Sequence, residues 1–235
     1  VMVAALVLLA AAAVVLQKGP LVPLAHSLGI GGPDRLLPAV DPSQESDAFV
    51  ILKADAVGDP VTYDPCRPIH YVINSDGAPA DYPTFILPAV NAAQEASGLS
   101  FAYDGLSDET WDDRQSGAAS GPVVIAFPTS VEEGDVSKDT VGLGGSTALT
   151  MNGALMPHYV TGAIALKRDW FVQQSAEHHT AEEQAVVMHE LGHVLGLGHV
   201  EDPDQLMYAS NRGQLTYGGG DLNGLAKLGS GDCGS

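Results

Sequence analysis

The sequence predicts an α+β domain, in which helices pack on one sheet. Two apolar runs, at 69–74 and 123–127, have the length and composition of buried strands. Between them, residues 82–96 carry apolar side chains at helical spacing, at Leu87, Val90 and Ala93. A chain of 235 residues is long enough to bury a substantial core around such a sheet.

Three further segments are predicted to be strands. Residues 49–52 form a short first strand, residues 100–103 follow the first helix, and residues 159–166 form the last strand. The run at 123–127 is apolar enough to be a central strand that is buried on both faces.

A second long helix is expected to begin near Thr180. Thr180 and Glu183 have the spacing of a capping box, in which the hydroxyl accepts from the Glu183 amide and the carboxylate reaches back. The apolar stripe of this helix comprises Ala185, Met188, Leu191 and Leu195. A helix buried along such a stripe is rigid enough to hold other side chains in fixed positions.

The same helix carries the pattern H-E-x-x-H-x-x-G-x-x-H, from His189 to His199. His189 and His193 are four residues apart, so they project from one face of a helix and can reach one Zn²⁺ at about 2.0–2.1 Å. Gly196 allows the chain to leave the helix through a left-handed turn, and His199 can then return as a third ligand. Three protein ligands leave a fourth position for water, which is typical of a catalytic zinc.

Glu190 follows the first predicted ligand directly. It borders the metal without being placed to bind it, which is where a general base for zinc-activated water belongs. The alternative is an amphipathic helix with solvated histidines. That alternative requires five fixed positions to coincide by chance.

Leu206-Met207-Tyr208 lies shortly after His199. On its own Met207 would be core, because Met fills irregular gaps, but after three histidines it resembles the Met-turn of the metzincins. This tripeptide and the run 221–229 resemble the matrixin branch of the metzincin metallopeptidases, over about residues 61–235. The resemblance implies a metzincin-like zincin domain with a twisted, mostly parallel sheet, an active-site helix, a Met-turn with a structural Met207, and a C-terminal helix.

Two positions depart from the matrixin pattern. Val200 and Glu201 stand where matrixins usually carry Ser, and no clear histidine and aspartate pattern is visible for the family's second, structural zinc. An acidic loop could hold Ca²⁺, but a solvated charged turn is the more common explanation for such exposed residues. This loop contains Glu132, Glu133 and Asp135.

By the same resemblance, one glycine-bearing segment is the edge strand at the rim of the substrate cleft. It comprises Leu143, Gly144, Gly145 and Ser146. An extended peptide could add to such an edge through backbone hydrogen bonds. The alternative is an ordinary hairpin that contains glycines.

The family implies an exported zinc-dependent endopeptidase, with Glu190 as general base and a peptide or protein as substrate. Two alternatives stay open. The chain could be a non-catalytic zinc-binding module, or a latent precursor whose segment 17–60 occupies the cleft.

Three regions are expected along the chain. Residues 1–16 are uniformly apolar and uncharged, which is typical of a signal peptide or a membrane anchor. Residues 17–48 are rich in proline and glycine, which is typical of a linker or a short pro-segment. Residues 49–235 form the catalytic domain. We therefore expect an extracellular protein, either secreted or tethered to the outer face of the cell membrane.

Acidic residues dominate the charge of the chain. Ten Lys and Arg against 29 Asp and Glu give a net charge of −19. Such a surface repels nucleic acid and favours solubility, so no nucleic-acid partner is expected. We also expect the protein to be a monomer.

Cys66 and Cys233 are the only cysteines. In an exported chain they are expected to form a disulfide, which would tie the start of the catalytic domain to its end. The alternative is that Cys66 is a removable zinc ligand that keeps the enzyme latent. The sequence around Cys66 matches that family motif poorly.

Overall fold

The computed structural model describes residues 34–42, 46–117, 120–129, 140–150, 157–210 and 212–233. The predicted signal peptide or anchor at 1–16, most of the predicted linker, and the acidic loop with Glu132, Glu133 and Asp135 lie outside the described residues. Arg35–Gly234 forms one compact unit. Within the described part, no helix is both long and apolar enough to cross a membrane.

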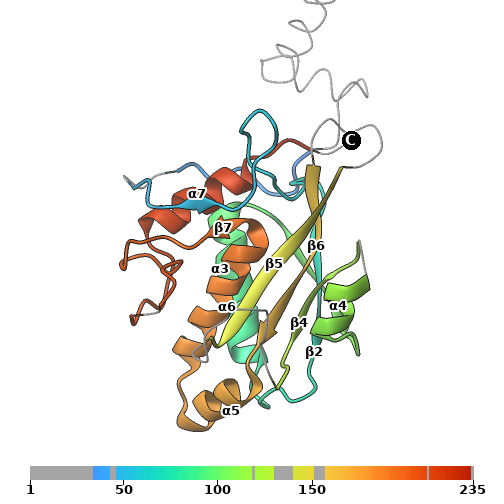
Figure 1. The fold of residues 1–235 in the computed structure, drawn as a ribbon, viewed down its shortest axis with the longest axis vertical. Coiled ribbons are helices and arrows are strands. Elements are labelled where there is room, and N and C mark those ends of the chain that lie inside the picture. Colours follow the sequence, from blue (N-terminus) through green and yellow to red (C-terminus); the bar gives the residue numbers. More distant parts are fainter. Residues whose placement is uncertain are drawn as a thin grey trace, which may run out of the picture. The chain divides into compact units, whose positions relative to one another are not determined.

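A five-stranded sheet forms the centre of this unit, in the order β3-β2-β4-β6-β5 (Figure 1). The first four of these strands are parallel, and β5 runs antiparallel to β6 at one edge. The mostly parallel sheet is therefore confirmed, and β4 is central and fully buried as expected. The strands are β2 (Ile69–Asn74), β3 (Phe101–Leu106), β4 (Val123–Ala126), β5 (Gly142–Thr150) and β6 (Pro157–Leu166).

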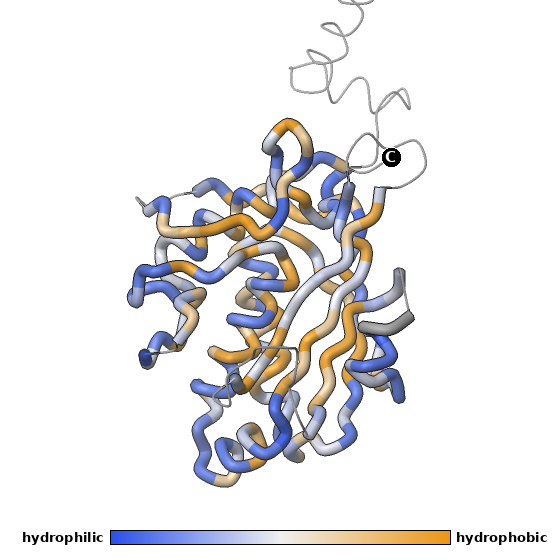
Figure 2. The backbone as a smooth tube through the Cα atoms, viewed as in Figure 1, coloured by the Kyte–Doolittle hydropathy of each residue, from blue (hydrophilic) through white to orange (hydrophobic). Residues whose placement is uncertain are grey.

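Helices cover both faces of the sheet. α3 (Pro83–Ser97) and α6 (Thr180–Leu195) lie on one face and α4 (Trp111–Gly117) on the other (Figure 1). Side chains of a strand alternate between faces, so Tyr71 and Ile73 join the main core while Val72 packs near Trp111. Figure 2 shows hydrophobic residues concentrated along the strands between these helices.

One predicted contact in α3 is wrong. Val90 and Ala93 are buried, but Leu87 is 42% exposed. The helix instead turns Phe85, Ile86 and Ala89 toward the core. Apolar residues lie around most of this helix and not only on its buried face. Their spacing alone therefore does not show which face is buried.

The capping box predicted at the start of α6 is also wrong. Thr180 is the first helical residue, His179 is the N-cap, and no side chain caps the helix. Glu183 is buried, and its carboxylate lies 2.7 Å from the hydroxyl of Ser175. Ser175 belongs to α5 (Arg168–Glu177), so packing between the two helices takes the carboxylate away from the N-cap.

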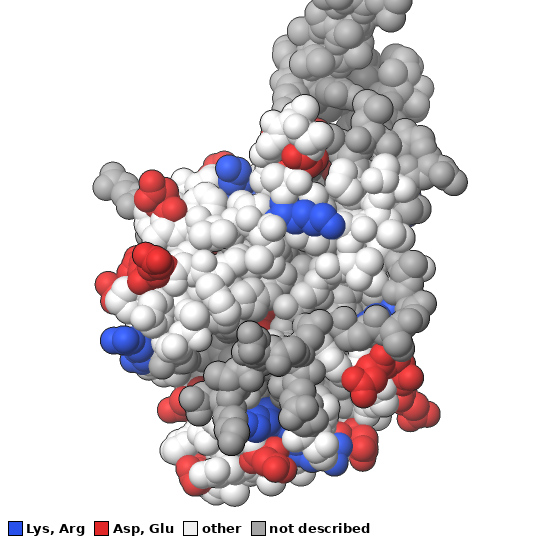
Figure 3. Space-filling view, viewed as in Figure 1, with Lys and Arg blue, Asp and Glu red and all other residues white. Residues whose placement is uncertain are grey.

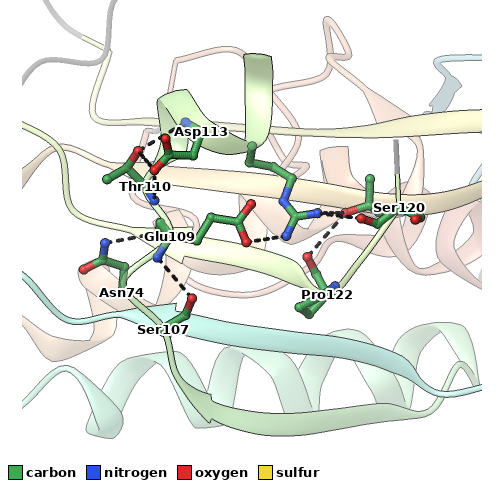
Figure 4. A network of polar contacts seen from close by, with 9 residues as sticks. Asn74, Ser107, Glu109, Thr110, Asp113, Ser120 and Pro122 are labelled. Carbon is green, nitrogen blue, oxygen red and sulfur yellow. Dashed lines mark hydrogen bonds and ion pairs between the residues drawn. The ribbon is translucent and has the colours of Figure 1, made fainter. Parts of the chain in front are cut away.

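α4 is held on its face of the sheet by a polar network (Figure 4). The buried guanidinium of Arg114 donates to Glu109 at 2.5 Å, to the Ser120 carbonyl and to the Thr161 hydroxyl. Thr110 and Asp113 cap the helix by hydrogen bonds to each other's backbone and side chain. The exposed acids Asp108, Asp112 and Asp113 lie on and beside this helix, where Figure 3 shows a group of acidic side chains.

The chain also closes on itself outside the main sheet. β1 (Val50–Ile51) pairs antiparallel with β7 (Leu197–Gly198) rather than joining the five strands. α7 (Gly219–Gly229) is the C-terminal helix that the family resemblance implied. After it, Cys233 forms the predicted disulfide with Cys66, with 5.4 Å between their Cα atoms. Because the sulfur of Cys66 is in this bond, the alternative of a removable zinc ligand is wrong.

Candidate metal centre

The three predicted ligands meet at one point. His189 and His193 project from α6, which ends at Gly196 in the left-handed region with φ 116°. β7 then leads the chain back to His199. The three Nε2 atoms form a triangle, with 3.1 Å between His189 and His193, 3.1 Å between His193 and His199, and 3.2 Å between His189 and His199.

The second nitrogen of two of these rings is fixed by a backbone carbonyl. Nδ1 of His189 donates to the oxygen of Leu206 at 2.7 Å, and Nδ1 of His193 donates to the oxygen of Leu197 at 2.8 Å. A neutral imidazole has one N–H, so in both rings Nε2 keeps a free lone pair. The lone pairs face one another, an arrangement that repels unless a cation lies between them.

These features fit a zinc ion. A tetrahedral zinc with bonds of about 2.0–2.1 Å separates its ligand nitrogens by about 3.3 Å, close to the observed triangle. Burial lowers the pKa of His189 to about 4 and that of His193 to about 3, and it also lowers the pKa of His199. All three rings are therefore neutral at pH 7, the state in which imidazole binds metal.

Glu190 lies on the side of α6 that faces β5. A Cβ placed on Gly142 would meet the carboxylate of Glu190, and one on Gly144 would meet its backbone carbonyl. Glycines at these two positions therefore allow the edge strand to approach the helix closely. Oε2 of Glu190 has no hydrogen-bond partner, and burial raises its pKa to about 8. Its role as general base stays a prediction.

Met207 lies against the helix between the two ligands of α6. A Cβ on Gly192 would be 2.5 Å from Sδ of Met207, and Met207 is almost fully buried. The amide of Val200, the residue after the third histidine, donates to the Met207 carbonyl at 3.1 Å. Met207 is therefore packed on the helix that carries two of the ligands, and its role in a Met-turn stays a prediction.

The turn that carries Met207 is tied to α7 by buried groups that sequence reasoning missed. The carboxylate of Asp221 accepts hydrogen bonds from the amides of Leu206 at 2.6 Å and Gly218 at 3.0 Å. A further bond joins the residues before α7 to α6: the hydroxyl of Tyr217 donates to the carbonyl of Met188 at 2.7 Å. The sequence did contain a signal for this contact. Asp221 follows three glycines in the first turn of a helix, and acidic residues there often accept hydrogen bonds from free backbone amides.

The predicted rim residues lie in β5, which pairs only with β6 among the described strands. The strand is fixed to α6 through Ser146, whose hydroxyl donates to the carbonyl of Val194 at 2.7 Å. The hydroxyl of Tyr63 lies 2.7 Å from the same Ser146 oxygen. Leu143, Gly144, Gly145 and Ser146 therefore form part of an edge strand next to the metal-binding helix, and their role as a substrate rim stays a prediction.

Two histidines on α6 and a third after it, beside a mostly parallel sheet, are compatible with a metzincin-like zincin. The matrixin family profile matches residues 84–228, which include the three histidines, Glu190 and Met207. The chain therefore belongs to the matrixin family. This membership confirms the predicted resemblance and supports a zinc-dependent metallopeptidase.

Other comparisons add little. No curated protein matches the chain. Among solved structures, the GM1-bound form of the ECX AB5 holotoxin is similar with a TM-score of 0.46 and 12% sequence identity, over 83% of this chain and 93% of that chain. That likeness is too weak to support an argument about function.

Proposed function

We propose that the protein is an exported zinc endopeptidase that hydrolyses peptide bonds in peptide or protein substrates. The observation that carries the proposal is the triangle of Nε2 atoms, with two of its three rings oriented by backbone carbonyls. His189, His193 and His199 would hold the ion. A bound Zn²⁺ supplies Lewis-acid chemistry, since it lowers the pKa of water and polarises a carbonyl group.

Glu190 is the proposed general base and acid. Its carboxylate takes a proton from the attacking water and passes it to the nitrogen of the leaving amine. Burial raises the pKa of Glu190 to about 8, which favours holding that proton, whereas a nearby cation favours the ionised form that must accept it. A carboxylate under both influences can move a proton in either direction near neutral pH.

β5 is the proposed substrate-binding strand. Its outer edge carries backbone N–H and C=O groups without a partner strand in the described part of the chain. An extended peptide can pair with such an edge whatever its side chains. The bond from Ser146 to Val194 keeps this edge at a fixed distance from α6, and therefore from the ligands.

Met207 is proposed to support the site without binding the ion. We further propose that the protein acts outside the cell, secreted or tethered through residues 1–16, as a monomer without nucleic-acid partners. The charge of −19 supports the last point.

The test is cleavage of casein by the full chain. We expect cleavage that is lost with a zinc chelator, restored by zinc, and abolished in Glu190→Ala, which should still bind zinc. Glu190→Ala cleaving at the wild-type rate would refute the assignment of the base. Stoichiometric zinc without cleavage would favour the non-catalytic module or a latent precursor, and cleavage of segment 17–60 on activation would identify the latter.

A further inference from the structure

The segment from Ser46 to Leu52, here called the N-terminal strap, is joined to the chain between the second and third histidines. Val50 pairs with Gly198 and Ile51 with Leu197. In the same register, the amide of Leu52 donates to the carbonyl of Gly196 at 2.9 Å. The strap therefore pairs with the three residues that lead from the end of α6 to His199.

The pairing also determines which way β7 turns its carbonyls. Hydrogen-bonded and non-hydrogen-bonded pairs alternate in an antiparallel ladder. Gly196 bonds to the strap, so the Leu197 carbonyl, one residue further on, points to the opposite side. There it accepts the hydrogen bond from Nδ1 of His193 at 2.8 Å. The strap therefore holds the segment Gly196–Gly198, in which the Leu197 carbonyl orients His193 and which leads directly to His199.

The strap is anchored on α7, away from the histidines. Gly220 and Gly224 are four residues apart on one face of that helix, and a Cβ on either would collide with Ala48 or Phe49. The side-chain amide of Asn223 donates to the Ser46 carbonyl at 2.6 Å. Lys227 lies over the ring of Phe49, with 5.8 Å from Nζ to the ring centroid. These contacts hold the strap to a helix that also carries Asp221, the anchor of the Met207 turn.

Two strap side chains cover the metal-bearing segment rather than fill the core. A Cβ on Gly198 would lie 3.0 Å from Val50 and 3.2 Å from Leu52. Yet Val50 is 46% exposed and Leu52 is 54% exposed. Val50 and Leu52 thus lie on the outer face of the strap, while Phe49 and Ile51 on its other face pack against the core.

We propose that the N-terminal strap is a positioning element of the zinc site, which holds Gly196–Gly198 so that His193 and His199 converge. The proposal rests on the proposed zinc site but not on peptidase activity. Groups that orient metal ligands typically change metal affinity by about 10–100-fold when they are lost. The strap would do so through backbone pairing rather than through a side chain.

The test compares Leu52→Pro with Leu52→Ala in the full chain. Both remove the same exposed side chain, but only proline removes the amide that donates to Gly196. Zinc affinity is measured by competition with a chromophoric chelator, and ligand geometry by the visible absorption of bound Co²⁺. We expect Leu52→Ala to stay within about two-fold of wild type and Leu52→Pro to bind zinc about ten-fold or more weakly, with an altered Co²⁺ spectrum. Equal zinc affinity and equal spectra in the two variants would overturn the proposal.

A second pair keeps the proposal testable if Leu52→Pro fails to fold. Phe49→Ala removes the anchor of the strap, and Phe101→Ala removes another half-buried aromatic side chain on the far edge of the sheet. We expect only Phe49→Ala to weaken zinc binding, by several-fold, although both lower stability. Equal effects on zinc affinity would mean that the strap acts through general stability alone, against the proposal.

These outcomes are separable from the proposed function. Wild-type protein that binds zinc but does not cleave casein would count against a constitutively active endopeptidase and leave the strap comparison intact. Wild-type protein that cleaves casein, with no difference between the two Leu52 variants in zinc affinity, would refute the strap alone.

Discussion

Asp221 and Leu206 are joined by a buried hydrogen bond of 2.6 Å, from the amide of Leu206 to the carboxylate of Asp221. The carbonyl of the same Leu206 accepts the hydrogen bond of His189. One residue, Leu206, therefore connects the first turn of α7 to a metal ligand through its amide and its carbonyl.

Asp221→Ala should accordingly affect both stability and metal binding. It leaves the buried amide of Leu206 without an acceptor, at about 1–3 kcal/mol, and it also removes the acceptor of the half-buried Gly218 amide. Asn at this position keeps one oxygen that can accept from both amides. We expect denaturant unfolding to show a large loss for the Ala variant and a smaller one for Asn. Zinc affinity should fall about ten-fold or more in the Ala variant. Unchanged zinc affinity in Asp221→Ala would show that Leu206 needs no anchor.

Gly192→Ala should disturb the turn beneath the ligands. The added methyl group would lie 2.5 Å from Sδ of Met207, so either the side chain or the turn must move. Overpacking of this kind typically costs about 1–3 kcal/mol. Gly145→Ala is the matched control, because nothing lies within 4 Å of its Cβ position. Thermal unfolding should separate the two variants, and a Gly192→Ala protein as stable as the control would contradict the packing of Met207 on α6.

The sequence was sufficient to predict the elements that have their own local signal. Apolar runs located β2, β4 and β6, and fixed spacing located the three histidines on and after α6. α5 gave no such signal, because Phe171 is its only buried residue. The pairing of β1 with β7 and the bond from Asp221 to Leu206 join residues far apart in the chain. Their partners depend on the folded arrangement, so no local pattern could indicate them.

Glu183 should make stability depend on pH. Its carboxyl and that of Asp81 each lie 2.7 Å from the single hydroxyl of Ser175. One hydroxyl has one proton to donate, so one of the two carboxyl groups must keep its own proton. Burial raises the pKa of Glu183, with the Asp81 charge adding to the effect, so Glu183 holds its proton more readily in the folded than in the unfolded chain.

The direction in which stability changes with pH follows from proton binding. Above the unfolded pKa of about 4.5 the unfolded chain releases this proton and the folded chain keeps it, so stability falls as pH rises toward the folded pKa. Glu183→Gln keeps the neutral form at every pH. We expect its advantage over wild type in urea unfolding to be small at pH 4.5 and to grow, by up to about 1.4 kcal/mol per pH unit, until the pH reaches the folded pKa of Glu183. The exposed neighbour Glu182→Gln is the control, and parallel curves for the two variants would rule out a buried proton.

The disulfide should stabilise the fold without contributing to the metal centre. It closes a loop with a sequence separation of 167, worth up to about 5 kcal/mol in the chain-entropy model. The double variant Cys66→Ser, Cys233→Ser should therefore unfold at lower denaturant concentration than wild type. At temperatures where it remains folded, its zinc affinity should match wild type. A loss of zinc binding in the folded variant would place the disulfide in the support of the site.

Zinc should stabilise the folded protein only while all three histidines are present. A ligand that binds the folded state alone stabilises it by about 2.7 kcal/mol at a hundred times its Kd. Wild type and Glu190→Ala should both show this rise in Tm when zinc is added to metal-free protein. His199→Ala should show little or none, because two ligands from one helix face do not complete the site. The contrast separates binding from catalysis, since Glu190→Ala keeps the thermal shift and loses cleavage, whereas His199→Ala loses both. An equal thermal shift in His199→Ala and wild type would mean that the ion binds elsewhere on the chain.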